Sequence, residues 1–401
     1  MKCRICHSDS LTKFLDLGYH PPSDAFLSDL NEPETHYPLT VYVCEDCELF
    51  QLGYVVPKEV LYCGKYPYET GMNVEGVFHF GLMAQNIVKK YNVGPGNLVV
   101  DIGCNDGTLL SAFEGSGCNL WGVEPTPHLS QKASEKGIPV YTGFFNRETP
   151  FQMVGKRAKV ITATNVFAHI DDLHDFMVGI DKMLAPDGVF IIEAPYVGSL
   201  LDNFEYDTIY HEHLSYLHPK PLSILFKQYG MFINNIEVFP IHGGTYRYHV
   251  CRGNLNGFEP EPLPDYTGFA SRVERNRNEL IWMLRAIKMK GKRIVGVSAP
   301  AKGNTLLNYC KIGPETLDYI TEKSPLKIGK FTPGTHIPIV PDSRLLEDMP
   351  DYAMIMAWNW AEPIMKNLKA YTDRGGKWII PVPEPHIAKV GAGVWSKIDG
   401  L

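Results

Sequence analysis

The stretch NLVVDIGCNDGTLLSAF, residues 97–113, decides the fold. Its first part, NLVV, is an apolar run typical of a buried strand in a parallel sheet, and its last part, TLLSAF, has the pattern of a helix. Between them lies a turn that contains Gly103 and Gly107, where a glycine lets the backbone approach a ligand closely. The stretch therefore predicts the opening strand, turn and helix of a doubly wound α/β domain.

The turn carries acids in place of the third glycine that a dinucleotide-binding fingerprint needs. Asp101 and Asp106 would repel a phosphate, but they suit a ligand with an amino group and hydroxyls, such as S-adenosylmethionine. A second expected strand, within residues 120–129, ends at Glu124, where an acid can accept hydrogen bonds from ribose hydroxyls. The turn favours an S-adenosylmethionine site, although a glycine turn with acids also occurs in other α/β domains.

Two further strands, expected within residues 158–173 and 188–197, continue the alternation of strands and helices. Because ligands bind at the C-terminal ends of parallel strands, the strand ends at 165–169 and 193–196 should share one crevice with the turn. The predicted cofactor-binding residues at this edge are Asp101, Gly103, Asn105, Asp106, Gly107, Glu124, Pro125 and Asn165.

Four of the nine cysteines fall near the N-terminus, as CRIC at 3–6 and CEDC at 44–47. Two such CxxC pairs can complete a tetrahedron of thiolates around zinc, and a site filled by four cysteines leaves no position for a water. The predicted ligands of this structural zinc are Cys3, Cys6, Cys44 and Cys47. Disulfide bonds are the alternative, and the reducing compartment inferred below argues against them.

Length and composition limit the class of protein. A chain of 401 residues with 44% hydrophobic and 21% charged residues is typical of a globular protein of two or three domains. A net charge of -7 makes nucleic acid or an anionic membrane an unlikely partner. The chain shows no apolar run of the roughly 18 residues that span a bilayer, and its N-terminus lacks the apolar core of a signal peptide. We therefore expect a cytoplasmic protein.

The stretch EYDTIYHEHLSYLHP, residues 205–219, holds three histidines, three tyrosines and three acids. A buried core would not favour these side chains, because each buried polar group needs a partner. Histidine has the pKa most useful to a general base near neutral pH, and acids and tyrosines can orient it or donate hydrogen bonds. We expect a catalytic segment, and a polar structural loop with satisfied histidines is the alternative.

Towards the C-terminus, a long helix near residues 269–290 leads into the expected strand KRIVGVS and then into APAKGNTLL. A strand, a turn of small residues and a helix can bind an anion, with helix N–H groups and Lys302 facing a phosphate. The turn lacks the GxxxxGK[ST] pattern of a P-loop, so we do not expect a nucleotide hydrolase.

The motifs DIGCNDGTLL, GVEPTP, TNVFAHIDDL and EYDTIYHEH closely resemble those of the S-adenosylmethionine-dependent C-methyltransferases of deoxysugar biosynthesis, and the resemblance covers essentially the whole chain. It implies a zinc domain, a Rossmann-like methyltransferase domain and a C-terminal Rossmann-like nucleotide-binding domain, which we expect at residues 1–61, 62–256 and 257–401 of a monomer. The implied reaction is methylation at C-3 of a nucleotide-linked 4-keto-6-deoxy sugar, through an enolate.

The resemblance also implies catalytic roles. Tyr210, Glu212 and His213 match the active-site Tyr, Glu and His of the family. His169 matches a further active-site histidine. His213 is the expected base and Tyr210 the alternative proton carrier, while Glu212 would orient a partner and His169 would stabilise the enolate.

Ligand-binding residues outside the catalytic segment are implied in the same way. Tyr66 and Tyr68 would cover the cofactor, although Thr70 and Gly71 stand where the family has serines. The implied substrate-binding residues are Tyr196, His242, Gly244, Arg247, Lys302, Asn304, Thr335, His336, Trp358 and Asn359.

Two other functions remain open. The same enolate, if it were reprotonated instead of methylated, would make the protein an epimerase or isomerase. A zinc-ribbon binding protein with inactive α/β domains is the non-enzymatic alternative. The complete S-adenosylmethionine motifs argue against the first, and the intact YHEH segment argues against the second.

Overall fold

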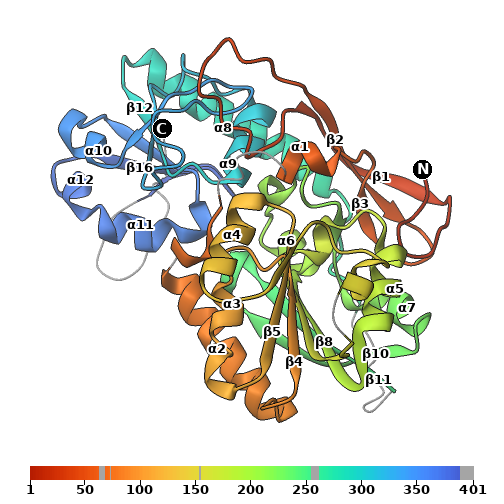
Figure 1. Cartoon of the computed structure of the whole chain (residues 1–401). Coiled ribbons are helices and arrows are strands. Elements are labelled where there is room, and N and C mark those ends of the chain that lie inside the picture. The colour runs from red at the N-terminus through yellow and green to blue at the C-terminus, as the bar shows by residue number, and fades with distance from the viewer. Residues whose placement is uncertain (63–67, 73, 153–154, 254–261, 389–401) are drawn as a thin grey trace. The chain divides into compact units, whose positions relative to one another are not determined.

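The structure is a computed structural model of the chain, and it describes residues 1–62, 68–72, 74–152, 155–253 and 262–388 (Figure 1). The chain forms two compact units that are interleaved along the sequence. The first unit comprises residues 1–12, 42–197 and 212–263, and the second comprises residues 13–41, 198–211 and 264–401.

The first unit is built on a seven-stranded sheet in the order β10-β11-β8-β7-β4-β5-β6. Strands β4 to β8 of this sheet are parallel to one another, and β10 and β11 extend it with antiparallel pairs. The strands are β4 (Leu98–Ile102), β5 (Asn119–Glu124), β6 (Val140–Thr142), β7 (Ala158–Thr164), β8 (Leu184–Pro195), β10 (Met231–Phe239) and β11 (Thr245–Arg252). The chain order reverses at β4, which lies between β5 and β7, so the C-terminal end of β4 is the usual ligand position of such a sheet.

Helices cover both faces of this sheet, and this explains the unbroken apolar run of β4 (Figure 1). Val99 joins a core with residues of α2, α3 and α4. Val100, the next residue, joins a second core with residues of α5 and α7. The helices are α2 (Val74–Tyr91), α3 (Thr108–Ser111), α4 (Pro127–Glu135), α5 (Leu173–Met183) and α7 (Pro219–Lys227). The predicted doubly wound α/β architecture is confirmed.

The N-terminal part forms a small four-stranded sheet in the order β1-β2-β3-β9. Its strands are β1 (Leu11–His20), β2 (Tyr37–Cys44), β3 (Phe50–Leu52) and β9 (Ser215–Tyr216), and the short helix α1 (Lys58–Tyr62) follows. Phe50 of β3 lies opposite Tyr216 of β9 in an antiparallel pair. The sheet thus joins the cysteine-rich N-terminus to the end of the predicted catalytic segment.

The second unit contains a six-stranded sheet in the order β14-β13-β12-β15-β16-β17, parallel except for β17. Its strands are β12 (Ile294–Val297), β13 (Ile320–Glu322), β14 (Ile339–Pro341), β15 (Tyr352–Ile355), β16 (Lys377–Ile380) and β17 (His386–Ala388). Its helices are α8 (Phe269–Met289), α9 (Ala301–Cys310), α10 (Ser343–Asp348), α11 (Ala361–Asn367) and α12 (Lys369–Asp373), and α6 (Val197–Asp202) leads into this unit. The expected second Rossmann-like sheet is present, and β12 leads into α9 at the predicted small-residue turn.

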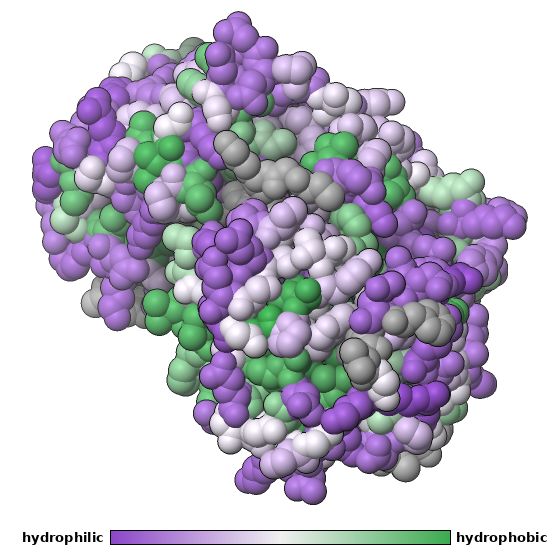
Figure 2. Space-filling view, in the orientation of Figure 1, coloured by the Kyte–Doolittle hydropathy of each residue, from purple (hydrophilic) through white to green (hydrophobic). Residues whose placement is uncertain are grey.

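Hydrophilic residues dominate the face shown in Figure 2, with smaller hydrophobic patches among them. One apolar stripe lies on α2, where Val74, Phe78 and Leu82, spaced four residues apart, are exposed. Among the helices that the structure describes, none combines the length and apolar character needed to cross a membrane.

Candidate active site

The four predicted zinc ligands lie together. The Sγ atoms of Cys3, Cys6, Cys44 and Cys47 are all within 4.8 Å of one another. Cys3 Sγ is 3.4 Å from Cys47 Sγ, and Cys6 Sγ is 3.5 Å from Cys44 Sγ. These distances exceed the roughly 2.05 Å of a disulfide bond. They are close to the roughly 3.8 Å between thiolates around a tetrahedral zinc ion. The donor set fits a structural zinc, as predicted.

The turn after β4 depends on glycine because it packs tightly. Gly103 and Gly107 have positive φ angles of 72° and 79°. A Cβ on Gly103 would lie 2.3 Å from Val166 Cγ2, in the loop after β7. A Cβ on Gly107 would lie 2.7 Å from Ile138. The glycines therefore let neighbouring loops close against the turn at the end of the sheet.

Two buried carboxylates, Asp101 and Glu124, lie near the C-terminal ends of β4 and β5. Asp101 is 2% exposed and accepts a hydrogen bond from the Thr162 hydroxyl at 2.7 Å, and burial raises the pKa of Asp101 to about 7. The oxygens of Glu124 accept hydrogen bonds from the N–H groups of Asn105, at 2.9 Å, and Thr126, at 2.8 Å. Burial raises the pKa of Glu124, and these hydrogen bonds oppose the shift. Each carboxylate keeps further lone pairs for a ligand's amino or hydroxyl groups.

The segment before α2 is attached to the same turn. The side-chain Oδ1 of Asn105 accepts a hydrogen bond from the Thr70 N–H at 3.0 Å, and its Nδ2 donates to the Tyr68 carbonyl at 3.2 Å. Asp106 Oδ2 accepts from the Gly71 N–H at 3.1 Å. A Cβ on Gly71 would lie 2.4 Å from that oxygen, so glycine is needed there. Tyr68 is thereby held beside the turn, and Tyr66 lies outside the described residues.

Two histidines of the first unit face each other near the end of β7. The rings of His169 and His213 have their centroids 5.2 Å apart, with 32° between the ring planes. Burial, and then the charge of His213, lower the pKa of His169 to about 3, so His169 is neutral near pH 7. The pair can therefore hold a neutral imidazole beside a second imidazole that exchanges a proton.

Tyr62 contacts both His169 and the residues that follow Glu124 at the end of β5, and no sequence motif indicated this role. Its ring stacks on His169 with centroids 6.1 Å apart. Its carbonyl accepts a hydrogen bond from the Thr126 hydroxyl at 3.2 Å, two residues after Glu124. Tyr62 is one of three tyrosines in YCGKYPYETGMN, residues 62–73, and no spacing in that segment distinguishes it from Tyr66 and Tyr68.

The remaining residues of the catalytic segment are divided by the unit boundary. Tyr210 belongs to the second unit, whereas Glu212 and His213 belong to the first. Glu212 is 3% exposed. The roles of Tyr210 and Glu212 stay predictions.

Other predicted cofactor and substrate residues lie close to these strand ends. Asn165 has a φ of 55° and donates its N–H to the Glu193 carbonyl at 2.7 Å. Pro125 directly follows Glu124 at the end of β5. Tyr196 stacks on Tyr246 with centroids 4.0 Å apart, and its N–H donates to the Gly244 carbonyl at 3.0 Å. The backbone of His242 lies in a short 3-10 turn, and its side chain is outside the described part of the structure.

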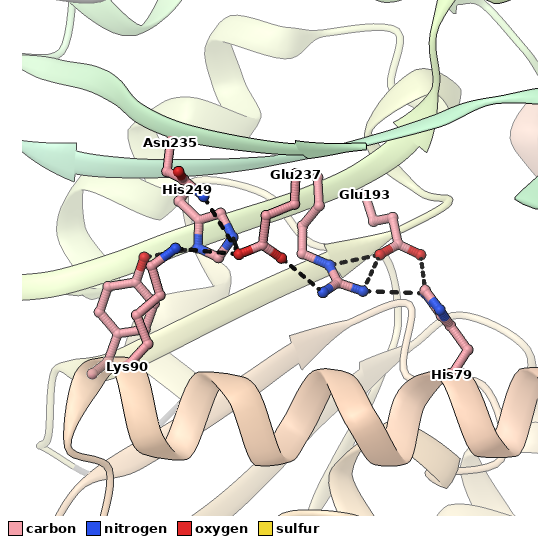
Figure 3. Close-up of polar contacts among 8 residues, drawn as sticks. His79, Lys90, Glu193, Asn235, Glu237 and His249 are labelled. Carbon is pink, nitrogen blue, oxygen red and sulfur yellow. Dashed lines mark hydrogen bonds and ion pairs between the residues drawn. The ribbon is translucent and has the colours of Figure 1, made fainter. Parts of the chain in front are cut away.

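Arg247 belongs to a network of charges with His79, Glu193 and Glu237, which Figure 3 labels. Its guanidinium is 2% exposed and binds the Glu193 carboxylate at 2.6 Å and the Glu237 carboxylate at 3.2 Å. His79 of α2 binds the other oxygen of Glu193 at 2.7 Å. Burial alone would raise the pKa of Glu193, but His79 and Arg247 hold it below its usual value. Arg247 therefore ties β8, β10 and α2 together, and its contact with a sugar stays a prediction.

In the second unit, three predicted substrate residues form one cluster. Lys302 Nζ donates to Asn359 Oδ1 at 2.6 Å and lies 4.4 Å from the centre of the Trp358 ring. Trp358 Nε1 donates to Asp207 Oδ2 at 2.7 Å. Burial lowers the pKa of Lys302, and the charges of Asp207 and Glu205 oppose this. A phosphate at Lys302 would have to compete with both carboxylates, and the predicted contact is untested.

Three other predicted substrate residues, Asn304, Thr335 and His336, contact other residues of the second unit. Asn304 is 2% exposed and donates to the Ser23 carbonyl at 2.6 Å. The hydroxyl of Thr335 is 2.8 Å from that of Thr332. His336 binds the carboxylate of Glu34. Their proposed substrate contacts stay predictions.

Comparisons with known proteins place this geometry in a family. Three family models match the chain: a zinc binding domain over residues 3–62, a methyltransferase domain over 83–233 and a C-methyltransferase C-terminal domain over 256–383. Part of the chain is also similar to a solved structure, magnesium protoporphyrin IX methyltransferase from Synechocystis PCC 6803 with bound SAH. That match is 15% identical, has a TM-score of 0.37, and covers 45% of this chain and 84% of that chain.

Two characterised relatives are similar in sequence. The ubiquinone biosynthesis O-methyltransferase of Azorhizobium caulinodans is 27% identical over 29% of this chain and 46% of its own length. C-methyltransferase NovU of Streptomyces niveus is 31% identical over 96% of both chains. Because this second match spans nearly the full length of both proteins, the chain belongs to the family of S-adenosylmethionine-dependent C-methyltransferases.

Proposed function

We propose that the protein methylates C-3 of a nucleotide-linked 4-keto-6-deoxy sugar and so makes a branched sugar. The observation that carries this proposal is the pair of facing imidazoles, His169 and His213, in the unit that holds the S-adenosylmethionine motifs. C–C bond formation at carbon needs a carbanion, and a ketone yields one when a base removes the proton of the adjacent carbon. The sugar itself rests on the resemblance of the EYDTIYHEH motif.

The two histidines would divide the work of making the enolate. His213 would accept the C-3 proton, and the electron pair of the broken C–H bond would move onto the ketone oxygen. His169, kept neutral by burial, would donate its ring N–H to that oxygen. The enolate carbon would then attack the methyl group that S-adenosylmethionine supplies when bound. The enolate's electron pair would form the new C–C bond as the ketone re-forms, and the electron pair of the methyl–sulfur bond would stay on sulfur. His213 would then release its proton to solvent.

Buried carboxylates would hold the cofactor. Glu124 is anchored by two backbone N–H groups, and its remaining lone pairs would accept hydrogen bonds from the ribose hydroxyls. Asp101, next to the glycine turn, would accept hydrogen bonds from the amino group. In the second unit, Trp358 and Lys302 would contact the nucleotide part of the substrate. The reduced thiols that a zinc site requires fit a cytoplasmic enzyme.

Mass spectrometry tests this function directly. The purified protein is incubated in deuterated water with S-adenosylmethionine and a panel of nucleotide-linked 4-keto-6-deoxy sugars. We expect one sugar to gain the mass of a methyl group. His213→Gln should lower the rate by about 10²- to 10⁴-fold, the usual contribution of a general base. His36→Gln, which changes an exposed histidine outside the proposed site, is the matched control and should methylate at the wild-type rate.

Two outcomes would contradict the proposal. Deuterium uptake by the sugar without a mass gain of methyl would assign an epimerase-type reaction to the same base. Methylation that survives in His213→Gln at the wild-type rate would remove His213 from the role of base.

A further inference from the structure

Arg4 lies in the sequence between the predicted zinc ligands Cys3 and Cys6, and its side chain bonds to other segments of the first unit. The side chain is 8% exposed. A buried guanidinium needs partners for its N–H groups, because an unpaired buried charge is costly. Arg4 Nε donates to Asp171 Oδ1 at 3.1 Å, and Nη1 donates to the carbonyls of Leu52, at 2.9 Å, and Leu214, at 3.2 Å.

The partners of Arg4 belong to the two chain segments that carry the facing histidines. Asp171 is two residues after His169, and Leu214 directly follows His213. One guanidinium is thus bonded to both segments, and the two rings lie 5.2 Å apart. A rigid planar fork of donors fixes direction as well as distance, so Arg4 limits how these segments move relative to each other.

The backbone at Arg4 is hydrogen-bonded to the side chain of Gln51 in β3. The Arg4 N–H donates to Gln51 Oε1 at 2.9 Å, and Gln51 Nε2 donates to the Lys2 carbonyl at 3.1 Å. Leu52, next to Gln51, donates its N–H to the Leu214 carbonyl at 2.9 Å. The first CxxC knuckle, β3 and the residue after His213 therefore form one hydrogen-bonded block.

A second contact from the same knuckle reaches the His169 side. The carbonyl of Ile5 lies 2.9 Å from His174 Nε2, at the start of α5. The rings of His7 and His174 stack with centroids 4.4 Å apart. Residues of and next to the first CxxC knuckle, Ile5 and His7, thus contact the start of α5, which directly follows the loop of His169 and Asp171.

We propose that Arg4 is a positioning residue, which transmits the fold of the four-cysteine site to the His169–His213 pair. The inference rests on the proposed function of that pair. The zinc site would then serve catalysis without touching the substrate, because a displacement of about 1 Å at a reacting group can cost on the order of 100-fold in rate.

The test uses the full-length protein carrying Arg4→Lys. Lysine keeps the positive charge, but its three N–H donors all lie on one nitrogen. They cannot reproduce the planar fork by which Arg4 bonds Asp171 through Nε and the two carbonyls through Nη1. We expect unchanged zinc content and a Kd for S-adenosylmethionine within about twofold of wild type, with kcat lowered by about 10- to 100-fold. Arg147→Lys, which changes an arginine paired at the surface with Asp175 of α5, is the matched control and should keep kcat.

A second readout does not depend on the reaction. In protein labelled with ¹⁵N-histidine, the ring signals of His169 and His213 are assigned with glutamine variants. Arg4→Lys should shift these two signals and leave the exposed His128 unchanged. Unchanged ring signals with wild-type kcat would overturn the proposal, and so would a loss of zinc from Arg4→Lys. If no sugar is methylated even by the wild type, the proposed function fails while the ring signals still test the positioning role.

Discussion

At the scale of single residues, burial determines which histidines of the first unit carry charge. His169 and His249 are both shielded from water, and the pKa values fall to about 3 and about 4, respectively. For His169, neutrality leaves an N–H donor that adds no positive charge next to His213. For His249, burial acts first and the charge of Lys90 adds to it, while Glu237 opposes both. Burial thus keeps both side chains neutral near pH 7, and at His249 it also makes the stability of the fold depend on pH.

His249→Asn should make folding less sensitive to acid. His249 in the folded state binds its proton only below about pH 4, whereas in the unfolded chain it does so near 6.5. Between these values the unfolded state holds more protons, so wild-type stability falls as the pH falls through this window. Asparagine does not titrate and can still accept a hydrogen bond from the Tyr91 hydroxyl, which lies 2.7 Å from His249 Nδ1.

Urea unfolding of both proteins at pH 7 and pH 4.5 measures this effect. The wild type should lose about 2 kcal/mol more than the variant between the two pH values. The comparison uses the change with pH, so a constant cost of the substitution cancels. Equal losses in the two proteins would show that His249 is not buried in its neutral form.

At the scale of elements, the sequence correctly predicted the strands, turns and ligand pairs that depend on residues close together in the chain. The run NLVV, the glycine turn and the acid that ends β5 are short-range patterns, and they correctly predicted β4, its turn and β5. The two CxxC pairs predicted the cysteine cluster, because each pair is a local ligand unit. What sequence patterns lacked were contacts between distant segments. Arg4 meets Leu214 across more than half the chain, and no periodicity or spacing indicates such a pair.

Gly71 illustrates the same limit. In the sequence, Gly71 was noted only because related proteins have a serine there. The structure shows why glycine fits this position: a Cβ would lie 2.4 Å from the Asp106 carboxylate. Residues 68–71 and the turn at 105–106 are each recognisable in the sequence, but their contact with each other is not. The resemblance implied that Tyr68 covers the cofactor, and this stays a prediction. The hydrogen bonds that hold residues 68–71 against Asn105 and Asp106 had no signal in the sequence.

Asn105→Gly should loosen residues 68–72 and weaken cofactor binding. Asn105 has a φ of 52°, which glycine adopts readily, so the turn itself should survive. The substitution removes the side chain that binds the Thr70 N–H and the Tyr68 carbonyl. A lost hydrogen bond of about 1 kcal/mol corresponds to roughly fivefold faster amide exchange at Thr70. The Kd for S-adenosylmethionine should rise by a similar factor.

Hydrogen–deuterium exchange and calorimetry measure the two effects together. Asn92→Gly is the matched control, since Asn92 is an exposed asparagine with a φ of 51° after α2. The control should leave both quantities unchanged. Weaker cofactor binding without faster exchange at Thr70 would mean that Asn105 contacts the cofactor directly instead of holding the segment.

At the scale of the whole molecule, the linear order of domains differs from how the compact units are assembled. The expected boundaries divide the chain into three consecutive parts, and they stay a prediction. The second unit includes residues 13–41 and 198–211 as well as the C-terminal part of the chain. Sequence patterns place strands and helices in order along the chain, but they do not reveal that residues 23–34 bond to α9 and to residues 331–336.

The early segments supply buried partners to the second unit. The Ser23 carbonyl accepts a hydrogen bond from Asn304, and the Ile209 carbonyl accepts one from the Thr305 hydroxyl at 2.9 Å. Leu27 pairs with Phe331 in an isolated antiparallel bridge. Asn304 and Thr305 are almost fully buried, so removing their partners would leave polar groups unsatisfied in the interior.

A fragment of residues 257–401 should therefore not fold into a stable domain. Each buried donor that loses its acceptor costs about 1–3 kcal/mol, and a few such losses approach the whole stability of a domain. Circular dichroism should show reduced helix content and no cooperative thermal transition for the fragment, at a temperature where the full chain melts cooperatively. Adding a peptide of residues 13–41 should restore part of the signal, because it returns Ser23 and Leu27. A fragment that melts cooperatively near the transition of the full chain would mean that the late sheet supplies its own core and that the early segments only cover its surface.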